Sequence, residues 1–312
     1  MRTRQEPEQL TWAWAQQRIW SQAANRLKQR IDHARLAALL LGIATAVLAV
    51  AAGQTGGLSM PAGRTLSAGA AITAGLATLL QRRGSTDQIR DWTRARSASE
   101  GLKTEIYSYL GGGAAYTGPG RDQRLGAQTR RIAEAVSDLQ RQTLGIEPDA
   151  KPMPAVHDID SYIALRVNHQ IHAYYTPKAA IYETRVRRLR MAGDLLGVTA
   201  VVLAAVAAAF RVGGLAAWVP VVTTIGTSVA AYIAAARYDH LVIEYLRTAQ
   251  RLEHLCRQHL DNPASDAATF IDACEAAISV ENQAWMARWD MPGQGKANGR
   301  SAASSQPPKG AG

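Results

Sequence analysis

The sequence predicts an all-α integral membrane protein made of two tandem transmembrane helical hairpins, with cytoplasmic amphipathic helices that form a bundle. Two observations predict this fold class. Paired apolar segments lie at about 36–80 and about 192–236, and charged residues bound each pair. Apolar residues also recur at helical spacing through most of the remaining chain. A helix needs about 20 apolar residues to cross a bilayer, so the two pairs predict four transmembrane helices.

The pair at 192–236 is the most apolar part of the chain. Its first arm, 195–210, carries no charge, and a short connector separates it from a second arm that ends before Arg237. Pro220 falls in the first turn of the second arm, where its missing N–H costs little. The alternative is a pair of buried helices in a soluble bundle. Soluble helices of this length usually carry polar residues at helical spacing, so we favour membrane insertion.

The pair at 36–80 has one strong arm and one weak arm. The first arm, 36–52, contains eight Leu, Ile or Val residues. A Gly-rich turn follows, and the second arm, 66–80, is short and rich in Ala and Gly. We expect this second arm to insert as the return arm of a hairpin rather than by itself.

The polar segments next to the hairpins are predicted to be helices as well. Amphipathic or heptad patterns indicate helices at 11–35, 86–110, 122–144, 158–175, 176–190 and 241–262, and a last helix that includes Trp285. The three prolines of 145–157 mark a linker. The chain therefore divides into a first unit at 1–150, a second unit at 151–291 and a disordered tail at 292–312, which has no apolar residue larger than Ala.

Local signals predict how the helices of the second unit begin and end. Asp158 or Asp160 can cap the first of them, and Ser265 or Asp266 can cap the last. Thr176 and Pro177 predict a new helix start, with Thr as N-cap and Pro at the first position. After the fourth apolar segment, the helix is expected to run straight on into the heptad pattern at 241–255.

The distribution of charge predicts the orientation. The chain has a net charge of +10, and its Arg and Lys residues cluster beside the apolar segments, whereas each hairpin turn carries one Arg. By the positive-inside rule, the hairpin turns lie outside, and the N- and C-termini are cytoplasmic in a multi-pass protein of the cell inner (plasma) membrane. A nucleic-acid binder could be equally basic, but this placement favours contact with anionic lipid and no nucleic acid.

Two sets of side chains are candidates for function. Hydroxyl groups on the second and fourth apolar segments can line a wet path or, more commonly, bond across helices; these are Thr73, Thr78, Thr223, Thr224, Thr227 and Ser228. Two heptad stripes offer surfaces for assembly into a homo-oligomer: Ile89, Trp92, Leu102, Ile106, Leu241, Tyr245, Leu252 and Leu255.

The sequence makes no case for an enzyme, a cofactor or a metal. The Gly-rich loop after residue 110 lacks the ending of a phosphate-binding loop. Helix-surface polarity is the favoured interpretation of the remaining candidates, because their spacings do not put full ligand or acid sets on one face. These candidates are His254, Cys256 and His259 with Cys274; His169 and His172 with Asp158 or Asp160; and the acids Glu275 and Glu281.

Three stretches carry a resemblance to a known family. WTRARSASEGLKTEIYSYL (92–110) follows the first hairpin, RVNHQIHAYYTPKA (166–179) precedes the second, and CEAAISVENQAWMARW (274–289) follows it. They resemble the SLATT group, the SMODS and SLOG-associating two-transmembrane effector domains of bacterial conflict systems. The likeness covers most of residues 12–290 and implies two tandem copies of different subtypes.

The resemblance implies a defence effector that forms a pore or disrupts the membrane as an oligomer when a nucleotide-sensing partner triggers it. We find no sensor domain here, so that partner would be a separate polypeptide. The alternative is a membrane-anchored scaffold whose hairpins only tether a cytoplasmic helical bundle. A third class, an enzyme on the membrane, has no catalytic residues to support it.

Overall fold

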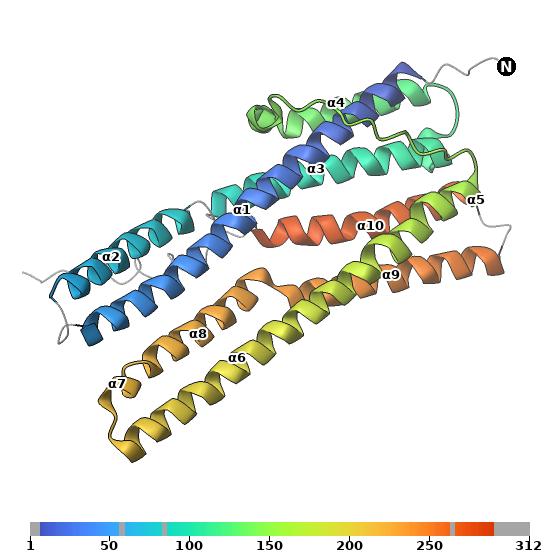
Figure 1. Cartoon of the computed structure of the whole chain (residues 1–312). Coiled ribbons are helices and arrows are strands. Elements are labelled where there is room, and N and C mark those ends of the chain that lie inside the picture. The colour runs from blue at the N-terminus through green and yellow to red at the C-terminus, as the bar shows by residue number, and fades with distance from the viewer. Residues whose placement is uncertain (1–6, 56–59, 83–85, 263–265, 290–312) are drawn as a thin grey trace, which may run out of the picture.

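The computed structural model describes residues 7–55, 60–82, 86–262 and 266–289, and these residues form helices joined by turns and one extended segment, with no strand among them. The all-α prediction is confirmed for this part of the chain. Two helical hairpins project from one end of the molecule, and the remaining helices gather at the other end (Figure 1). The tail at 292–312 lies outside the described residues.

The first hairpin consists of α1 (Glu8–Thr55) and α2 (Met60–Arg82). One unbroken helix therefore joins the polar segment at 11–35 to the first apolar arm. Both helices extend into the predicted Gly-rich turn, and Pro61 is the second residue of α2, a position where a missing N–H is tolerated. The next helix, α3 (Thr86–Gly111), packs back along the polar half of α1, as the amphipathic pattern predicts.

The helix predicted at 122–144 is split in the structure. After the short η1 (Ala114–Tyr116), α4 (Arg121–Ala135) ends at Val136, and a 3₁₀ helix, η2 (Ser137–Thr143), follows. Val136 has φ −123° and is buried with Leu139 in the cluster that contains Trp20. The prediction of one continuous helix is therefore wrong. The break lets the side chains of Val136 and Leu139 pack on α1 and α3.

The second unit begins with 52 consecutive helical residues, Ile159–Phe210. They comprise α5 (Ile159–Tyr162), the π-helical segment η3 (Ile163–Tyr175) and α6 (Thr176–Phe210). Asp158 caps this helix in a capping box with Ser161, which confirms one of the two predicted caps.

The predicted restart at Thr176 is wrong, because the helix is continuous there. Thr176 has helical dihedral angles, and its N–H donates to the carbonyl of Ile171, five residues back. Pro177 lacks an N–H, and in an α-helix its ring would clash with the carbonyl four residues earlier. The wider π-turns before Pro177 change the position of that carbonyl, so the helix passes the proline without ending.

The second hairpin returns through α7 (Gly213–Ala216), α8 (Val219–Ala236) and α9 (Tyr238–Asp261). Pro220 lies in the first turn of α8, as predicted. The predicted straight run from α8 into α9 is wrong, because Arg237 is left-handed with φ 50°. The kink turns Tyr238 inward, where its ring lies 5.3 Å from that of Tyr182 and its hydroxyl accepts a hydrogen bond from Arg185.

The last helix, α10 (Ala267–Trp289), starts at a cap formed by Asp266, whose carboxylate accepts hydrogen bonds from the N–H groups of Ala268 and Thr269. This confirms the second predicted cap. The other candidate for it, Ser265, lies outside the described residues, and so does Pro263 of the predicted break. α10 packs against both α3 and α9 and so joins the two halves of the chain.

Three of the helical stretches are long and apolar enough to cross a bilayer: Glu8–Thr55, Ile159–Phe210 and Gly213–Asp261. Large apolar side chains on both hairpins are more than half exposed, as lipid-facing residues are; examples are Leu40, Ile72, Leu79, Leu195, Val201 and Phe210. The shorter α2 is not among the three stretches, in keeping with its Ala- and Gly-rich sequence. Three of the four predicted spans are thus supported.

The three apolar clusters lie outside the hairpins, in a part of the molecule that we call the helical head (residues 8–35, 86–143, 158–190, 238–262 and 266–279), and Ile146 and Val156 of the linker pack into them. One apolar cluster joins η3, α9 and α10, a second joins α1, α3 and η2, and a third joins α1, α3 and α4. The helices that become membrane arms are therefore held together by the head at their roots.

Candidate functional site

A buried ion pair lies where the two halves of the chain meet. Arg166 on η3 donates two hydrogen bonds to the carboxylate of Glu275 on α10, with distances of 2.7 Å from Nε to Oε1 and 2.6 Å from Nη2 to Oε2. The two side chains are 1% and 3% exposed. The hydroxyl of Tyr162 donates to Oε1 at 3.0 Å, and that of Thr104 on α3 donates to Oε2 at 2.9 Å. One carboxylate thereby holds three elements that are far apart in sequence.

The surroundings stabilise the charged state of this pair. Each carboxylate oxygen of Glu275 accepts two hydrogen bonds, and the Arg166 guanidinium lies 4.4 Å from the centre of the Tyr107 ring. Burial by itself lowers the pKa of Arg166, but the charge of Glu275 and its hydrogen bonds raise it above the ordinary value. Nη1 of Arg166 is buried without a hydrogen-bond partner in the described part of the chain, so the carboxylate is fully bonded and the guanidinium is not. A buried ion pair of this kind adds little net stability, and we expect it chiefly to specify how its elements pack.

A second charged group extends along α3 beside the pair. Arg96 contacts Glu100 at 2.9 Å, one helical turn away. Burial would raise the pKa of Glu100, but Arg96, Lys103 and other nearby cations together lower it. Burial lowers the pKa of Lys103 to about 8, with Glu100 acting in the opposite direction. The first half of the chain therefore presents alternating charges to the second half.

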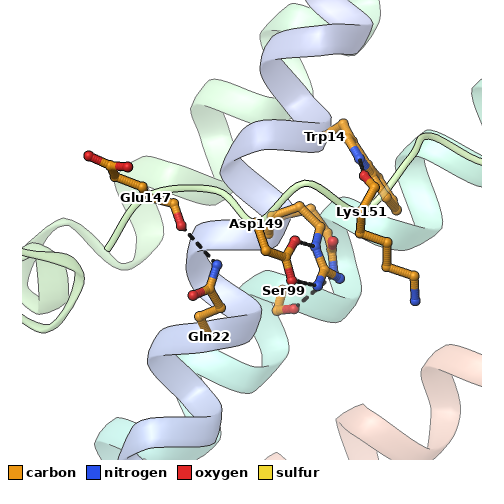
Figure 2. A network of polar contacts seen from close by, with 8 residues as sticks. Trp14, Gln22, Ser99, Glu147, Asp149 and Lys151 are labelled. Atoms are coloured by element: carbon orange, nitrogen blue, oxygen red, sulfur yellow. Dashed lines mark hydrogen bonds and ion pairs between the residues drawn. The ribbon is translucent and has the colours of Figure 1, made fainter. Parts of the chain in front are cut away.

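The linker at 145–157 is bound to the head as a strap. Three side chains on one face of α1 hold it: Trp14 donates to the carbonyl of Lys151 at 3.0 Å, Gln22 donates to the carbonyl of Glu147 at 2.9 Å, and Arg18 forms a bidentate pair with Asp149 between them. Figure 2 shows this side of α1 facing the strap, with Ser99 of α3 beneath. The spacing of four residues puts the three side chains in a row.

The predicted hydroxyl groups divide into two kinds. Thr73 on α2 lies 2.8 Å from Thr45 on α1, oxygen to oxygen, and so bonds across the first hairpin. Thr78, Thr223 and Thr227 are exposed and donate to carbonyls of their own helices. Thr224 is also exposed and Ser228 is partly exposed, so the hydroxyls of α8 lie largely on its outer face. A wet path lined by these groups would need more than one chain and stays a prediction.

The predicted assembly stripes pack inside the chain. Leu102 and Ile106 of α3 and Leu252 of α9 are fully buried, Ile89 and Tyr245 are buried, and Trp92, Leu241 and Leu255 are partly buried against the same clusters. The heptad pattern thus marks intramolecular contacts, because the covering helices come from elsewhere in the same chain. Contacts between copies would have to use other faces, and a homo-oligomer stays a prediction.

Among the described residues, no three His, Cys, Asp or Glu side chains gather in a way that could hold a metal. Cys274 is buried in the cluster of η3, α9 and α10, and Cys256 packs against that cluster. The ring of His259 stacks on Phe270 at 4.5 Å. Glu275 forms an ion pair with Arg166, and the side chain of Glu281 lies outside the part of the chain that the structure describes.

The pairing of Arg166 with Glu275 is not predicted by the sequence patterns. They place Glu275 only as an acid near Glu281, and Arg166 only at the start of a stretch that resembles the SLATT group. One signal could have found Arg166: with Tyr162 and Gln170 it has four-residue spacing, so it lies on the face that the helix buries. A charged residue on a buried face requires a partner, although the sequence does not say which one.

Apolar hairpins rooted in a polar helical head are characteristic of a helical membrane protein. Residues 162–285 match the family model described as SMODS and SLOG-associating 2TM effector domain 1, so the second half of the chain is similar to the two-transmembrane effector domains of the SLATT group. This match supports the resemblance to the SLATT group. Residues 18–123 match a different model, described as protein of unknown function (DUF4231). No curated protein and no solved structure matches the chain.

The two matched regions meet at the buried ion pair. The SLATT match begins at Tyr162 and includes both Arg166 and Glu275, whereas Thr104 and Tyr107 lie in the other matched region. The carboxylate of Glu275 therefore connects the region that matches the SLATT model to the first unit.

Proposed function

We propose that this protein is a membrane effector of a bacterial conflict system, which assembles as an oligomer and permeabilises the inner membrane when a separate nucleotide-sensing protein triggers it. The observation that carries the proposal is a SLATT domain whose apolar hairpin stands on a polar head next to a second, similar hairpin. We further propose that residues 18–123 act as a second effector unit of the same plan, with α2 as the fourth span.

Contacts between the hairpins support concerted action of the two units. α1 packs against α8, and at the far end of the hairpins Gln54 donates to the carbonyl of Gly214 at 2.8 Å. Both hairpins also stand on continuous helices of the head, α1 and α6. If one helix of the head moved relative to another, both hairpins would therefore move together.

The test is a release assay on liposomes that contain the purified full chain. We expect a trapped dye or ion to leak when lysate fractions from the native host supply the activating partner. Thr227→Leu and Ser228→Leu should change the leak rate, because they replace the hydroxyls on the outer face of α8. The leak rate of Thr78→Leu, the same kind of replacement on α2, is compared with theirs to test the first hairpin. Liposomes that stay tight under every activating fraction would exclude the effector role.

One observation favours a second candidate, a membrane-anchored scaffold. Thr45 and Thr73 use their hydroxyls to join α1 to α2, which is what a tether requires. A scaffold would stay in the carbonate-washed membrane and capture partners through its head, and its liposomes would not respond to Thr227→Leu. An enzyme on the membrane is the third class, and nucleotide turnover by the purified chain would reveal it.

A further inference from the structure

A cavity lies in the helical head where the two units face each other. It has a volume of about 260 Å³ and is lined by side chains from α1, α3, η3, α6 and α9. Among the residues that the structure describes, its lining includes three cations, Lys28, Arg96 and Lys178, and no carboxylate. Four aromatic rings share the lining: Trp92, Tyr174, Tyr182 and Tyr245. Neither the ion pair at Glu275 nor the hairpins account for this combination.

The cations and rings of the cavity are arranged against each other. The Lys28 ammonium lies 5.3 Å from the centre of the Trp92 ring, and the Lys178 ammonium lies 4.2 Å from that of Tyr174. Arg96 donates to the Tyr174 hydroxyl at 3.0 Å and also contacts Glu100, which lies outside the lining. Tyr245 is buried and packs against Tyr174 and Tyr182, whereas Trp92 is partly exposed. Cations of this kind bind phosphate oxygens, and an aromatic ring that lines a cavity can stack on a planar base.

We propose that this cavity binds a mononucleotide, with its phosphate on Lys28, Arg96 and Lys178 and its base against Trp92. The volume of about 260 Å³ lies just below the range of about 300–1,000 Å³ for ligand sites, so the ligand is expected to be no larger than a mononucleotide. Both chemical parts of the ligand have matching side chains, whereas a bare phosphate would use only the cations.

The position of the cavity favours a soluble ligand over a lipid headgroup. Lys28 lies eight residues before Leu36, which is about 12 Å along a continuous helix. The headgroup layer extends only about 5–8 Å beyond the hydrocarbon core. The phosphate-binding cations of α1 thus lie past the layer in which a lipid phosphate resides.

A ligand in this cavity would connect the roots of both hairpins. Lys28 is on the helix that becomes the first membrane arm, Lys178 is on the helix that becomes the third, and Tyr245 is on the helix that follows the fourth. Resting on the proposed function, we infer that nucleotide binding changes the relative position of α1 and α6. The chain would then receive part of its trigger directly.

The experiment measures binding by calorimetry on the purified full chain in neutral detergent. AMP and GMP are the probes, and inorganic pyrophosphate is the ligand without a base. We expect one nucleotide per chain. Lys28→Gln and Lys178→Gln should each weaken binding at least about tenfold, because each removes a charge-assisted hydrogen bond. Trp92→Ala should reduce nucleotide affinity toward that of pyrophosphate.

The matched control is Lys151→Gln, the same substitution on the exposed strap, which should leave binding unchanged. Circular dichroism and the unfolding midpoint verify that each variant is folded. Failure of both AMP and GMP to bind would overturn the site. It would also be overturned if pyrophosphate bound as tightly as the nucleotides and Trp92→Ala changed neither affinity. Displacement of AMP by phosphatidylglycerol in nanodiscs, lost in the same Lys variants, would assign the cavity to a lipid headgroup instead.

The binding result is independent of permeabilisation. Nucleotide binding by a chain whose liposomes stay tight would retain the site and reject the effector role. Leakage by a chain that binds no nucleotide would retain the effector role and reject the site.

Discussion

Glu275 is the residue whose loss should damage the fold most. Glu275→Gln keeps the side-chain volume but leaves the Arg166 guanidinium buried without its counter-charge. Removing one partner of a buried ion pair costs about 3–5 kcal/mol. We expect a loss of that size in the free energy of unfolding, measured by denaturant titration in mild detergent. Glu253→Gln is the control, because Glu253 is an exposed carboxylate on α9.

The double variant Arg166→Met with Glu275→Leu separates charge from packing. Apolar replacement of a buried pair is often neutral or stabilising. Here the hydroxyls of Tyr162 and Thr104 lose their acceptor, at about 1–3 kcal/mol for each hydroxyl that stays unsatisfied. The double variant should therefore recover only part of the stability that Glu275→Gln loses, and the shortfall measures the two hydroxyls. A single variant that costs less than about 1 kcal/mol would contradict the structural role assigned to this pair.

Lys103 should make the stability of the head depend on pH in the alkaline range. Burial lowers its pKa to about 8 in the folded chain, whereas an unfolded lysine has a pKa of about 10.4. Between these values the unfolded chain binds more protons at this residue, so the contribution of Lys103 to stability rises as the pH increases from about 8 toward 10. Lys103→Met should flatten that rise when unfolding midpoints are compared at several pH values.

The window for this comparison is pH 8 to about 9.5. Burial also raises the pKa values of Cys256 and Cys274, so the unfolded chain loses those thiol protons first within this window and they make stability fall as the pH rises. The buried Tyr107 and Tyr162 act in the same direction at higher pH. Wild type and Lys103→Met share these groups, so the difference between their pH profiles reports Lys103 alone. Lys151→Gln serves as the exposed control. An equal rise with pH in wild type and Lys103→Met would assign the effect to other groups.

At the scale of the elements, the hydrogen bond between Thr45 and Thr73 should stabilise the first hairpin. Hydrogen bonds between membrane helices contribute about 0.6 kcal/mol on average. Thr45→Val and Thr73→Val should each lose about that amount, and the double variant should lose little more. A double-mutant cycle on unfolding in mixed micelles measures the coupling. Thr78→Val is the control, since its hydroxyl donates within its own helix, and a coupling energy of zero would show that the bond contributes nothing.

Most helices could be predicted from sequence because their signals are local. Apolar runs, capping residues such as Asp158 and Asp266, and the first-turn Pro220 lie within a few residues of the boundary that they predict. The kink at Arg237 has no such signal. It depends on packing between Tyr238 and Tyr182, which is 56 positions earlier on another helix. Propensity within α8 and α9 favours a straight helix, and this distant contact overrides it.

The candidate site was less predictable for the same reason. Helical periodicity correctly showed that Leu102 and Leu252 lie on an apolar face, but it does not say what covers that face. The covering helices belong to the same chain, so these residues pack in the core and do not form the predicted assembly surface. The pair Arg166–Glu275 joins residues 109 positions apart, and the cavity between the units exists only after both units have packed.

At the scale of the whole molecule, charge and packing favour the same topology. The helical head contains most of the cations next to the apolar arms, and it is the end at which both hairpins are rooted. The connection Arg211–Trp218, which contains α7, lies at the end of the second hairpin that is far from the head (Figure 1). A molecule with this distribution should place its head on the cytoplasmic side.

Cysteine labelling in intact cells tests this orientation. The background carries Cys256→Ser and Cys274→Ala, since Cys256 is partly exposed and Cys274 is buried. Gly214→Cys places a thiol near the tip of the second hairpin, where Gly214 is exposed and an added Cβ meets only Gln54 Oε1, at 3.9 Å. Ser137→Cys places one on the exposed surface of η2 in the head. A membrane-impermeant maleimide should label Gly214→Cys in intact cells and Ser137→Cys only after permeabilisation. The reverse pattern would invert the topology, and labelling of neither residue in intact cells would mean that the second hairpin does not cross the membrane.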